Sequence, residues 1–320
     1  MSAPTLRRPA PHPSGPSRPR PSGLTWAVLR LHRAALLLWG GFLLVTAVVL
    51  AWMYVIAPEA RAAAGPVTSE GTYRTGTALV STALSYLMFP VAAWAGGALT
   101  GRELEDGTAH LAWTQSVSPA RWLAVKLAVP AAALTAGTTL AVLLLGWARR
   151  GGDPRLVDAW YDPDVHLALG PAAVAHVLAG LALGALAGLV LRRALPAAAV
   201  AFALTLVVHE VLEAYRPSLW PASTVTGRAA LALPPDALDL EHGAVTTDGQ
   251  RIGNDLACVG SQTPAQVRTC MKEAGLSDFW ASYHPRSHLW PLQLVESGVL
   301  LAVAGAATAA AFALLRRRTA

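Results

Sequence analysis

Charged residues and cysteines are scarce in this 320-residue chain. Only 14% of the residues are charged and 54% are hydrophobic, whereas roughly a quarter of the residues in a soluble domain are charged. This scarcity of charge excludes an ordinary soluble protein and indicates residence in a bilayer. Lysine occurs only at Lys126 and Lys272, so arginine carries most of the positive charge behind the formal net charge of +6.

Nucleotide-binding motifs are absent as well. Neither Gly-x-x-x-x-Gly-Lys-Ser/Thr nor Gly-x-Gly-x-x-Gly occurs, so the chain has no recognisable means of binding nucleotide phosphates. No Ser/His/Asp constellation stands out to indicate a hydrolase. We therefore expect no enzymatic activity, no catalytic residue, no metal and no cofactor on this chain.

Long apolar runs dominate what is present. A hydrocarbon core requires about 20 apolar residues per helix, and six stretches qualify: 34–56, 78–99, 122–146, 171–191, 195–214 and 291–315. They predict an all-α membrane protein with six transmembrane helices. Residues 1–22 are rich in proline and arginine, which predicts a disordered tail. Residues 23–33 have an amphipathic pattern, which predicts a helix lying at the membrane interface.

Arginines flank the first and last apolar runs and form the Arg192-Arg193 turn. Because basic residues concentrate in cytoplasmic loops, we place both termini, this turn and residues 101–121 in the cytoplasm. The connections at 57–77, 147–170 and 215–290 then lie outside, with Arg149 and Arg150 as an exception. The same rule explains the basic composition, so we predict contact with lipid and none with nucleic acid.

Both cysteines lie in the segment between the fifth and sixth predicted spans. Cys258 and Cys270 within one exported segment predict a disulfide, with two unpaired thiols as the alternative. Asp248-Gly249 predicts a turn in this segment. Residues 263–275 predict a small helix with a capping box at its start and a glycine beyond its end.

Four ionisable residues are candidates for a polar pathway, namely His209, Glu210, Glu213 and Glu296. Ionisable groups inside a membrane are costly and often functional. The first three resemble the start of a zinc-peptidase His-Glu-x-x-His motif, but Glu213 stands where the second histidine is required. Exposure at the helix end, or pairing with Arg216, is the structural alternative.

Another histidine pair, His284 and His288, is spaced like metal ligands. Pro285 between them disfavours the helix that would align the two rings, so we predict no metal site there.

Small residues and prolines mark special positions in the spans. Gly180, Gly184 and Gly188 recur every four residues, which predicts a close helix–helix contact. The pattern does not distinguish contact within the bundle from a dimer seam. Pro90 and Pro130 permit kinks in the second and third spans.

A compact polar segment, residues 101–121, separates the second and third apolar runs. Gly107 can reverse the chain because glycine accepts left-handed dihedral angles. Thr108 can then cap a short helix that carries Trp113 as an apolar knob. An ordinary solvated loop is the alternative.

Charges lie at both ends of this segment. Glu103 and Glu105 are predicted to pair with basic groups of a partner or with Arg121, fixing the register of a contact.

The stretch from Gly101 to Arg121, together with Lys126, resembles the membrane subunits of type 2 ATP-binding-cassette (ABC) exporters. These subunits often have a Glu-x-Gly-Thr turn, which is found here at 105–108. A Ser/Thr-Pro/Arg-x-Arg segment follows in them, and residues 118–121 have this form. Residues 283–298 are similar to the corresponding stretch of actinobacterial permeases of this group.

The resemblance implies the permease subunit of an ATP-driven exporter in the bacterial cell membrane. A coupling helix between spans two and three would dock on a separate cytoplasmic ATPase subunit, which would hold ATP and Mg. The coupling residues would be Glu103, Glu105, Gly107, Thr108, Trp113 and Arg121. The resemblance also implies pairing with a second copy or a sister permease, and an apolar or amphipathic substrate.

The predicted organisation has five parts: a tail at 1–22, an interfacial helix at 23–33, spans one to five with the coupling loop at 34–214, an extracellular domain at 215–290, and span six with a basic tail at 291–320. The connection of about 75 residues between spans five and six departs from the family pattern, which has a re-entrant segment there. A membrane-anchored sensor or scaffold with an extracellular ligand-binding domain is the alternative function.

Overall fold

A computed structural model of the chain describes residues 29–61, 67–114, 117–151, 156–253 and 263–319, together with Gly23 and Cys258. The predicted tail at 1–22 lies outside the described residues, and so do residues 24–28 of the predicted interfacial helix.

Six helical segments in the described part of the chain are long and apolar enough to cross a membrane. They confirm the six predicted spans. Span one is α2 (Arg33–Arg61), span three is α7 (Pro119–Gly151), span four is α9 (Pro171–Leu191), span five is α10 (Ala194–Tyr215) with η3 (Arg216–Ser218), and span six is η5 (Arg286–His288) with α12 (Leu289–Thr319).

Span two is composite. It consists of α3 (Val67–Ser85), α4 (Met88–Trp94), the π-helix η1 (Ala95–Gly101) and α5 (Arg102–Glu105). The break between α3 and α4 comes just before Pro90, which lacks an N–H and whose ring crowds the carbonyl four residues earlier. Pro130, by contrast, lies inside the continuous helix α7.

The first part of α3 was predicted to be a loop, yet it is helical. Its polar side chains are satisfied inside the bundle: the Tyr73 hydroxyl donates to the Ala148 carbonyl at 3.0 Å. The Thr77 hydroxyl donates back to the Tyr73 carbonyl at 3.0 Å. Hydrophobicity alone did not reveal this extension, because the stabilising contacts come from another helix.

Helix α9 forms the centre of the bundle, packing against α4, η1, α7, α10 and α12. Its glycine repeat faces span two: a Cβ atom at Gly180 would lie 2.7 Å from the Met88 carbonyl oxygen, and one at Gly188 would lie 2.7 Å from that of Gly96. The repeat therefore makes a contact within the chain, which decides between the two predicted readings.

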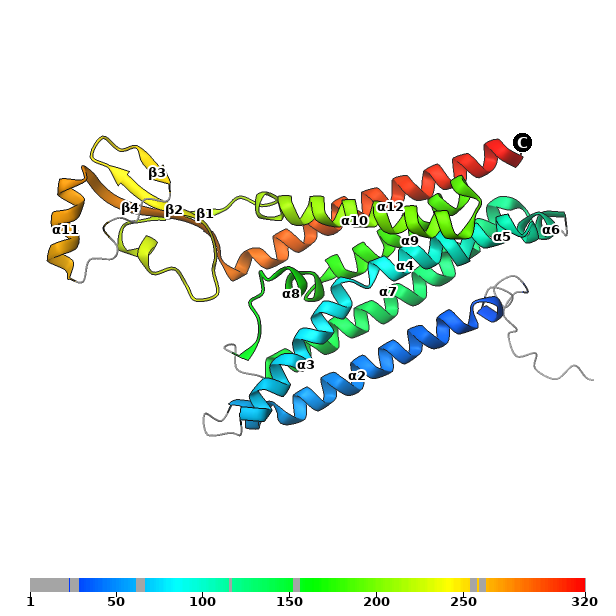
Figure 1. Ribbon diagram of the computed structural model, residues 1–320, viewed down its shortest axis with the longest axis horizontal. Helices are drawn as coiled ribbons and strands as arrows, with labels where there is room; N and C mark the ends of the chain where they lie inside the picture. Colours follow the sequence, from blue (N-terminus) through cyan, green and yellow to red (C-terminus); the bar gives the residue numbers. More distant parts are fainter. Residues whose placement is uncertain are drawn as a thin grey trace, which may run out of the picture.

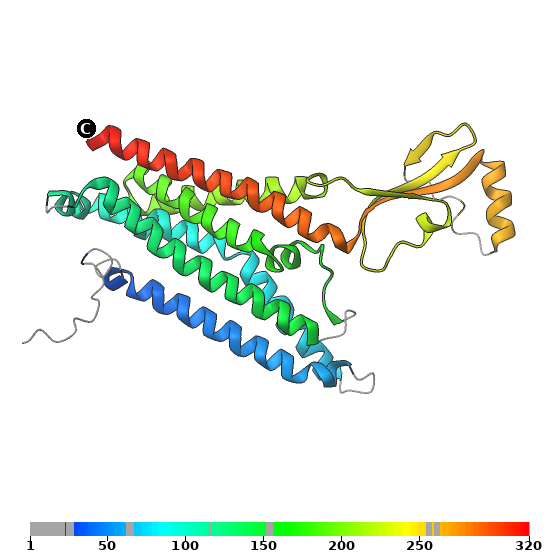
Figure 2. The same cartoon turned by 180° about the vertical axis from the view of Figure 1, so that it is seen from behind.

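The two ends of the bundle differ. Helices α5 and α6 (Thr108–Thr114) lie at the same end as the C-terminus, which we call the α6 end (Figure 1). The opposite end, which we call the sheet end, carries the segment between α10 and α12, and the view from behind shows the same arrangement (Figure 2).

A four-stranded antiparallel sheet occupies this segment. It contains β1 (Ser223–Thr226), β2 (Leu238–Thr246), β3 (Arg251–Gly253) and β4 (Leu276–His284), in the order β1-β4-β2-β3, with the 3-10 turn η4 (Gly227–Leu231) after β1. The all-α prediction thus holds for the spans and misses this sheet. The predicted Asp248-Gly249 turn does join β2 to β3, and Gly249 has a φ of 84°.

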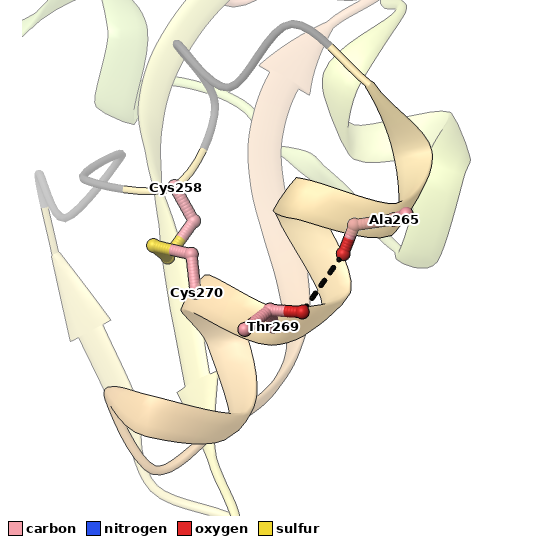
Figure 3. The surroundings of a disulfide bond; sticks show 4 residues. All are labelled: Cys258, Ala265, Thr269 and Cys270. Atoms are coloured by element: carbon pink, nitrogen blue, oxygen red, sulfur yellow. Dashed lines mark hydrogen bonds between the residues drawn. A yellow bond between two sulfur atoms is a disulfide. The ribbon is translucent and has the colours of Figure 1, made fainter.

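The predicted small helix is α11 (Pro264–Glu273). Thr263 and Gln266 form the capping box, and Gly275 has a φ of 68° beyond the helix end. The predicted disulfide between Cys258 and Cys270 is present, and it fixes the chain before α11 to the helix itself (Figure 3). In the same view the Thr269 hydroxyl donates to the Ala265 carbonyl at 3.1 Å.

The glycine face of α9 yields a stability prediction. We expect Gly184→Leu to lower the thermal unfolding midpoint of the detergent-purified protein, because its side chain would meet the Ala92 carbonyl and the Ala95 side chain. Overpacking of this kind costs about 1–3 kcal/mol. Gly305→Leu is the matched control, since a Cβ at Gly305 meets nothing within 4 Å. Equal midpoints for the two variants would contradict the prediction.

Candidate functional site

The connection between spans two and three folds as two short helices, α5 and α6, joined by a glycine turn. Gly107 has a φ of 71°, and its carbonyl accepts the first backbone hydrogen bond of α6, from the His110 N–H at 3.1 Å. Thr108 was predicted to cap α6, but its hydroxyl instead donates to the Glu103 carbonyl at 3.2 Å. This bond ties α6 back onto α5.

Glu103 is anchored to span three. One of its carboxylate oxygens lies 2.5 Å from Lys126 Nζ, and the other accepts a hydrogen bond from Trp122 Nε1 at 3.2 Å. Lys126, which is only 2% exposed, also donates to the Leu99 carbonyl in the π-helix at 2.8 Å. The charged partner of Glu103 is thus Lys126, while Arg121 is exposed.

Glu105 is anchored to span five. Its carboxylate accepts a hydrogen bond from the backbone N–H of Ala194, the first residue of α10, at 2.8 Å. The first N–H groups of a helix have no partner within the helix, and a negative charge there is favourable. The short helix α5 is therefore joined to α7 through Glu103 and to α10 through Glu105.

The aromatic residue of α6 faces its own chain. Trp113 makes an edge contact with Trp122, with ring centroids 5.6 Å apart, and another with His110 at 4.7 Å. It packs against the core cluster that contains Trp122. Leu111 is the large apolar residue of α6 that is exposed, at 62%.

A second polar cluster lies at the sheet end, around Glu296 of α12. Glu296 is completely buried, and its Oε2 atom contacts His166 Nε2 at 3.1 Å and Arg216 Nε at 3.3 Å. His166 belongs to α8 (Pro163–Ala168), a short helix that the sequence did not predict. Burial lowers the pKa of the His166 imidazole, which favours the neutral ring as a donor to Glu296.

Gln293 fixes this cluster in place. Its side-chain oxygen accepts a hydrogen bond from the Ala172 N–H at 2.9 Å, and its amide nitrogen donates to the His166 carbonyl. Helices α8, α9 and α12 are joined in this way.

The four predicted pathway residues differ in their exposure. Glu296 faces the interior, whereas Glu210 is exposed on α10. His209 is buried and lies 3.3 Å from the Glu213 carboxylate, whose side chain is 36% exposed. His176 of α9 was not predicted, although its ring centroid lies 6.0 Å from that of His209.

The sheet is connected to the bundle by side-chain contacts as well as by the chain. His284 Nε2 lies 2.9 Å from the Pro217 carbonyl and its Nδ1 lies 2.9 Å from His288 Nδ1. Trp160, in the chain before α8, donates to the Asp236 carbonyl at 2.6 Å. The segment that carries the sheet is therefore held both to η3 and to the chain before α8.

Comparison with known proteins identified one family. A family model described as "ABC-2 membrane transporter related" matches residues 34–216, which is more than half of the chain. No curated protein and no solved structure matches the chain.

The buried ion pair at the α6 end yields a prediction. We expect Lys126→Met to lower the free energy of unfolding by about 3 kcal/mol, because it leaves the Glu103 side chain, which is only 15% exposed, without its cation. Adding Glu103→Gln should recover part of this loss. Arg102→Met is the control: its pair with Asp106 is exposed, and such pairs contribute about 1 kcal/mol or less. Equal unfolding midpoints for Lys126→Met and Arg102→Met in detergent would contradict the prediction.

Proposed function

Because the chain belongs to the ABC-2 membrane transporter related family, we propose that it is the permease subunit of an ATP-driven exporter and that α5 and α6 dock on a separate ATPase chain. The supporting observation is the double anchorage of α5 through Glu103 and Glu105. A solvated loop would not place one carboxylate on a buried lysine and the next on a helix N-terminus.

This anchorage supports a mechanism. A force on α6 passes to α5 through the Thr108 hydrogen bond. From α5 it passes to spans three and five through Glu103 and Glu105. ATP binding and hydrolysis on the partner would move these spans together and switch the bundle between inward-facing and outward-facing states. In this proposal ATP and Mg are bound by the partner, and α5 and α6 of the present chain transmit the motion to the spans.

The exposed surface of α6 supplies a docking contact. Leu111 is its exposed apolar side chain, and the charged residues Arg102, Asp106 and Arg121 of the same connection are exposed too. An apolar centre with a charged rim is the usual anatomy of a protein interface. The charged rim would set the register of the ATPase on the permease.

The orientation of the protein in the membrane follows from the position of its arginines. We place the α6 end in the cytoplasm of a bacterial cell, since the arginines in the last turn of α12 and the Arg192-Arg193 turn lie there as well. The sheet and its disulfide would then lie outside the cell, where disulfides persist.

A second permease subunit, identical or related, and membrane lipids would surround the bundle. Large apolar side chains on the outer surfaces of α2 and α10 are exposed in the single chain, including Leu38 on α2 and Val207 on α10. We infer that the substrate is apolar or amphipathic and that Glu210, with the half-exposed Glu213, lies along its route.

Docking is tested through Leu111. We expect Leu111→Asp to weaken copurification of the cognate ATPase at least tenfold, since loss of a central interface residue costs about 2 kcal/mol. Its unfolding midpoint should match that of the wild type, because the side chain is exposed. Leu231→Asp is the control, as this leucine is exposed in η4 at the sheet end. Full ATPase binding by Leu111→Asp would show that α6 is not the docking element.

The route is tested through Glu210. We expect Glu210→Gln to reduce export several-fold while ATPase binding and protein yield stay unchanged, because the charge lies on the open face of α10. Glu241→Gln removes an equally exposed carboxylate from β2 and should export normally. Wild-type export by Glu210→Gln and by the Glu210→Gln/Glu213→Gln double variant would remove these residues from the route.

A further inference from the structure

A cavity of about 310 Å³ lies between spans one, two and three, at the α6 end of the bundle. Small-molecule sites in proteins have volumes of roughly 300–1,000 Å³. None of the residues that we assign to ATPase docking or to the substrate route lines this cavity. Its lining includes Leu36, Trp39 and Phe42 of α2, Val91 of α4, and Ala133 and Leu134 of α7.

The walls of the cavity are apolar. The polar atom of Trp39 is already paired, since its Nε1 donates to the Ala133 carbonyl at 3.2 Å. The Trp39 ring stacks on Phe42, with centroids 5.5 Å apart. His32 is the one titratable residue in the described lining, and its ring makes an edge contact with Trp94 at 5.4 Å. An apolar cavity stays dry and accepts apolar molecules.

The two prolines within the spans explain why this space exists. Pro90 and Pro130 both line the cavity. Helix α2 packs against α3 and α7, and the break between α3 and α4 comes just before Pro90. Span two therefore stays in contact with α2 before the break, and the cavity lies between α2 and α4 after it.

The cavity opens on the outer surface of the bundle. Leu38, which lines it, is 77% exposed, and Pro90 on the facing span is exposed as well. Helix α2 lies at the edge of the bundle in both views (Figures 1 and 2). Since these spans cross a membrane, the hydrocarbon chains of the bilayer are the molecules that meet this opening.

The length of the cavity matches one leaflet of the bilayer. His32 and Phe42 are ten residues apart, which is about 15 Å along a helix. Half of a hydrocarbon core of about 30 Å is also about 15 Å. Arg33 follows His32 directly and is exposed, and basic residues at the membrane surface attract anionic lipid headgroups.

We propose that this cavity binds one acyl chain of an anionic phospholipid from the leaflet at the α6 end. The chain enters between α2 and α4 and extends from His32 to Phe42, and the headgroup lies at Arg33. The bound chain fills the space beside the two prolines and links span one to spans two and three. The site does not depend on the proposed transport activity.

Occupation of the cavity is tested with the full-length protein in vesicles of equal parts phosphatidylglycerol and phosphatidylcholine. After extraction in mild detergent, native mass spectrometry should find a phospholipid retained on the wild type. Ala35→Phe and Ala133→Phe place a ring in the lining and should lower the retained fraction several-fold. Ala34→Phe and Ala132→Phe are the matched controls, because these neighbouring alanines are exposed and do not line the cavity.

The headgroup is tested through Arg33. The lipid retained by the wild type should be mainly phosphatidylglycerol. Arg33→Gln should shift the retained lipid toward phosphatidylcholine, because it removes the cation beside the headgroup. Arg61→Gln removes an exposed arginine from the opposite end of α2 and should leave the ratio of the two lipids unchanged.

Labelling of the wild type requires no variant to fold. A phospholipid with a photoreactive diazirine at the end of one acyl chain should label the chain near Phe42 and Leu87, at the inner end of the cavity.

Three results would overturn the proposal. The first is a wild type that retains no phospholipid or is labelled only away from the cavity. The second is equal retention by the two cavity-filling variants and their neighbouring controls. The third is the same ratio of the two lipids in Arg33→Gln and in Arg61→Gln.

Discussion

The close contact between α9 and span two is the constraint on which the rest of the structure depends. The glycines of α9 bring the two helix backbones close together. The polar backbone groups of span two must therefore find hydrogen-bond partners within this contact. The π-helical turn of η1 lies in this contact, and the Leu99 carbonyl within it accepts Lys126. Because Lys126 also holds Glu103, the packing in the bundle centre determines where α5, the last part of span two, lies. The position of α6 follows.

The polar groups near the two ends of α9 differ in how they are paired. Near its C-terminal end Lys126 pairs with Glu103, and Glu105 with the start of α10, while Trp113 Nε1 has no partner among the described residues. Near its N-terminal end His176 and its neighbours have polar atoms without a partner among the described residues. A fully satisfied buried network rigidifies a fold, whereas an incompletely satisfied one is costly.

Hydrophobic patterning predicted the spans because membrane insertion depends on local composition. Local motifs predicted the helix α11, from its capping box, and the disulfide, from the position of the two cysteines. The sheet was missed because β4 pairs with β1 and β2 across long stretches of sequence. Helix α8 was missed because its burial comes from contacts with other elements. Hydropathy assigned residues 67–77 to a loop for the same reason.

The site residues show the same difference between local features and contacts that are distant in sequence. Glu103, Glu105 and Gly107 were predicted from a local motif, but the partners of the two glutamates, Lys126 and the Ala194 N–H, are distant in sequence. One signal was available: Lys126 is one of two lysines and lies in an apolar run, and a charge in such a place requires a partner. The same reasoning applies to His176, a lone imidazole among alanines and leucines in α9. An isolated ionisable residue in a span thus indicates that a partner exists, and only the packing of the helices identifies it.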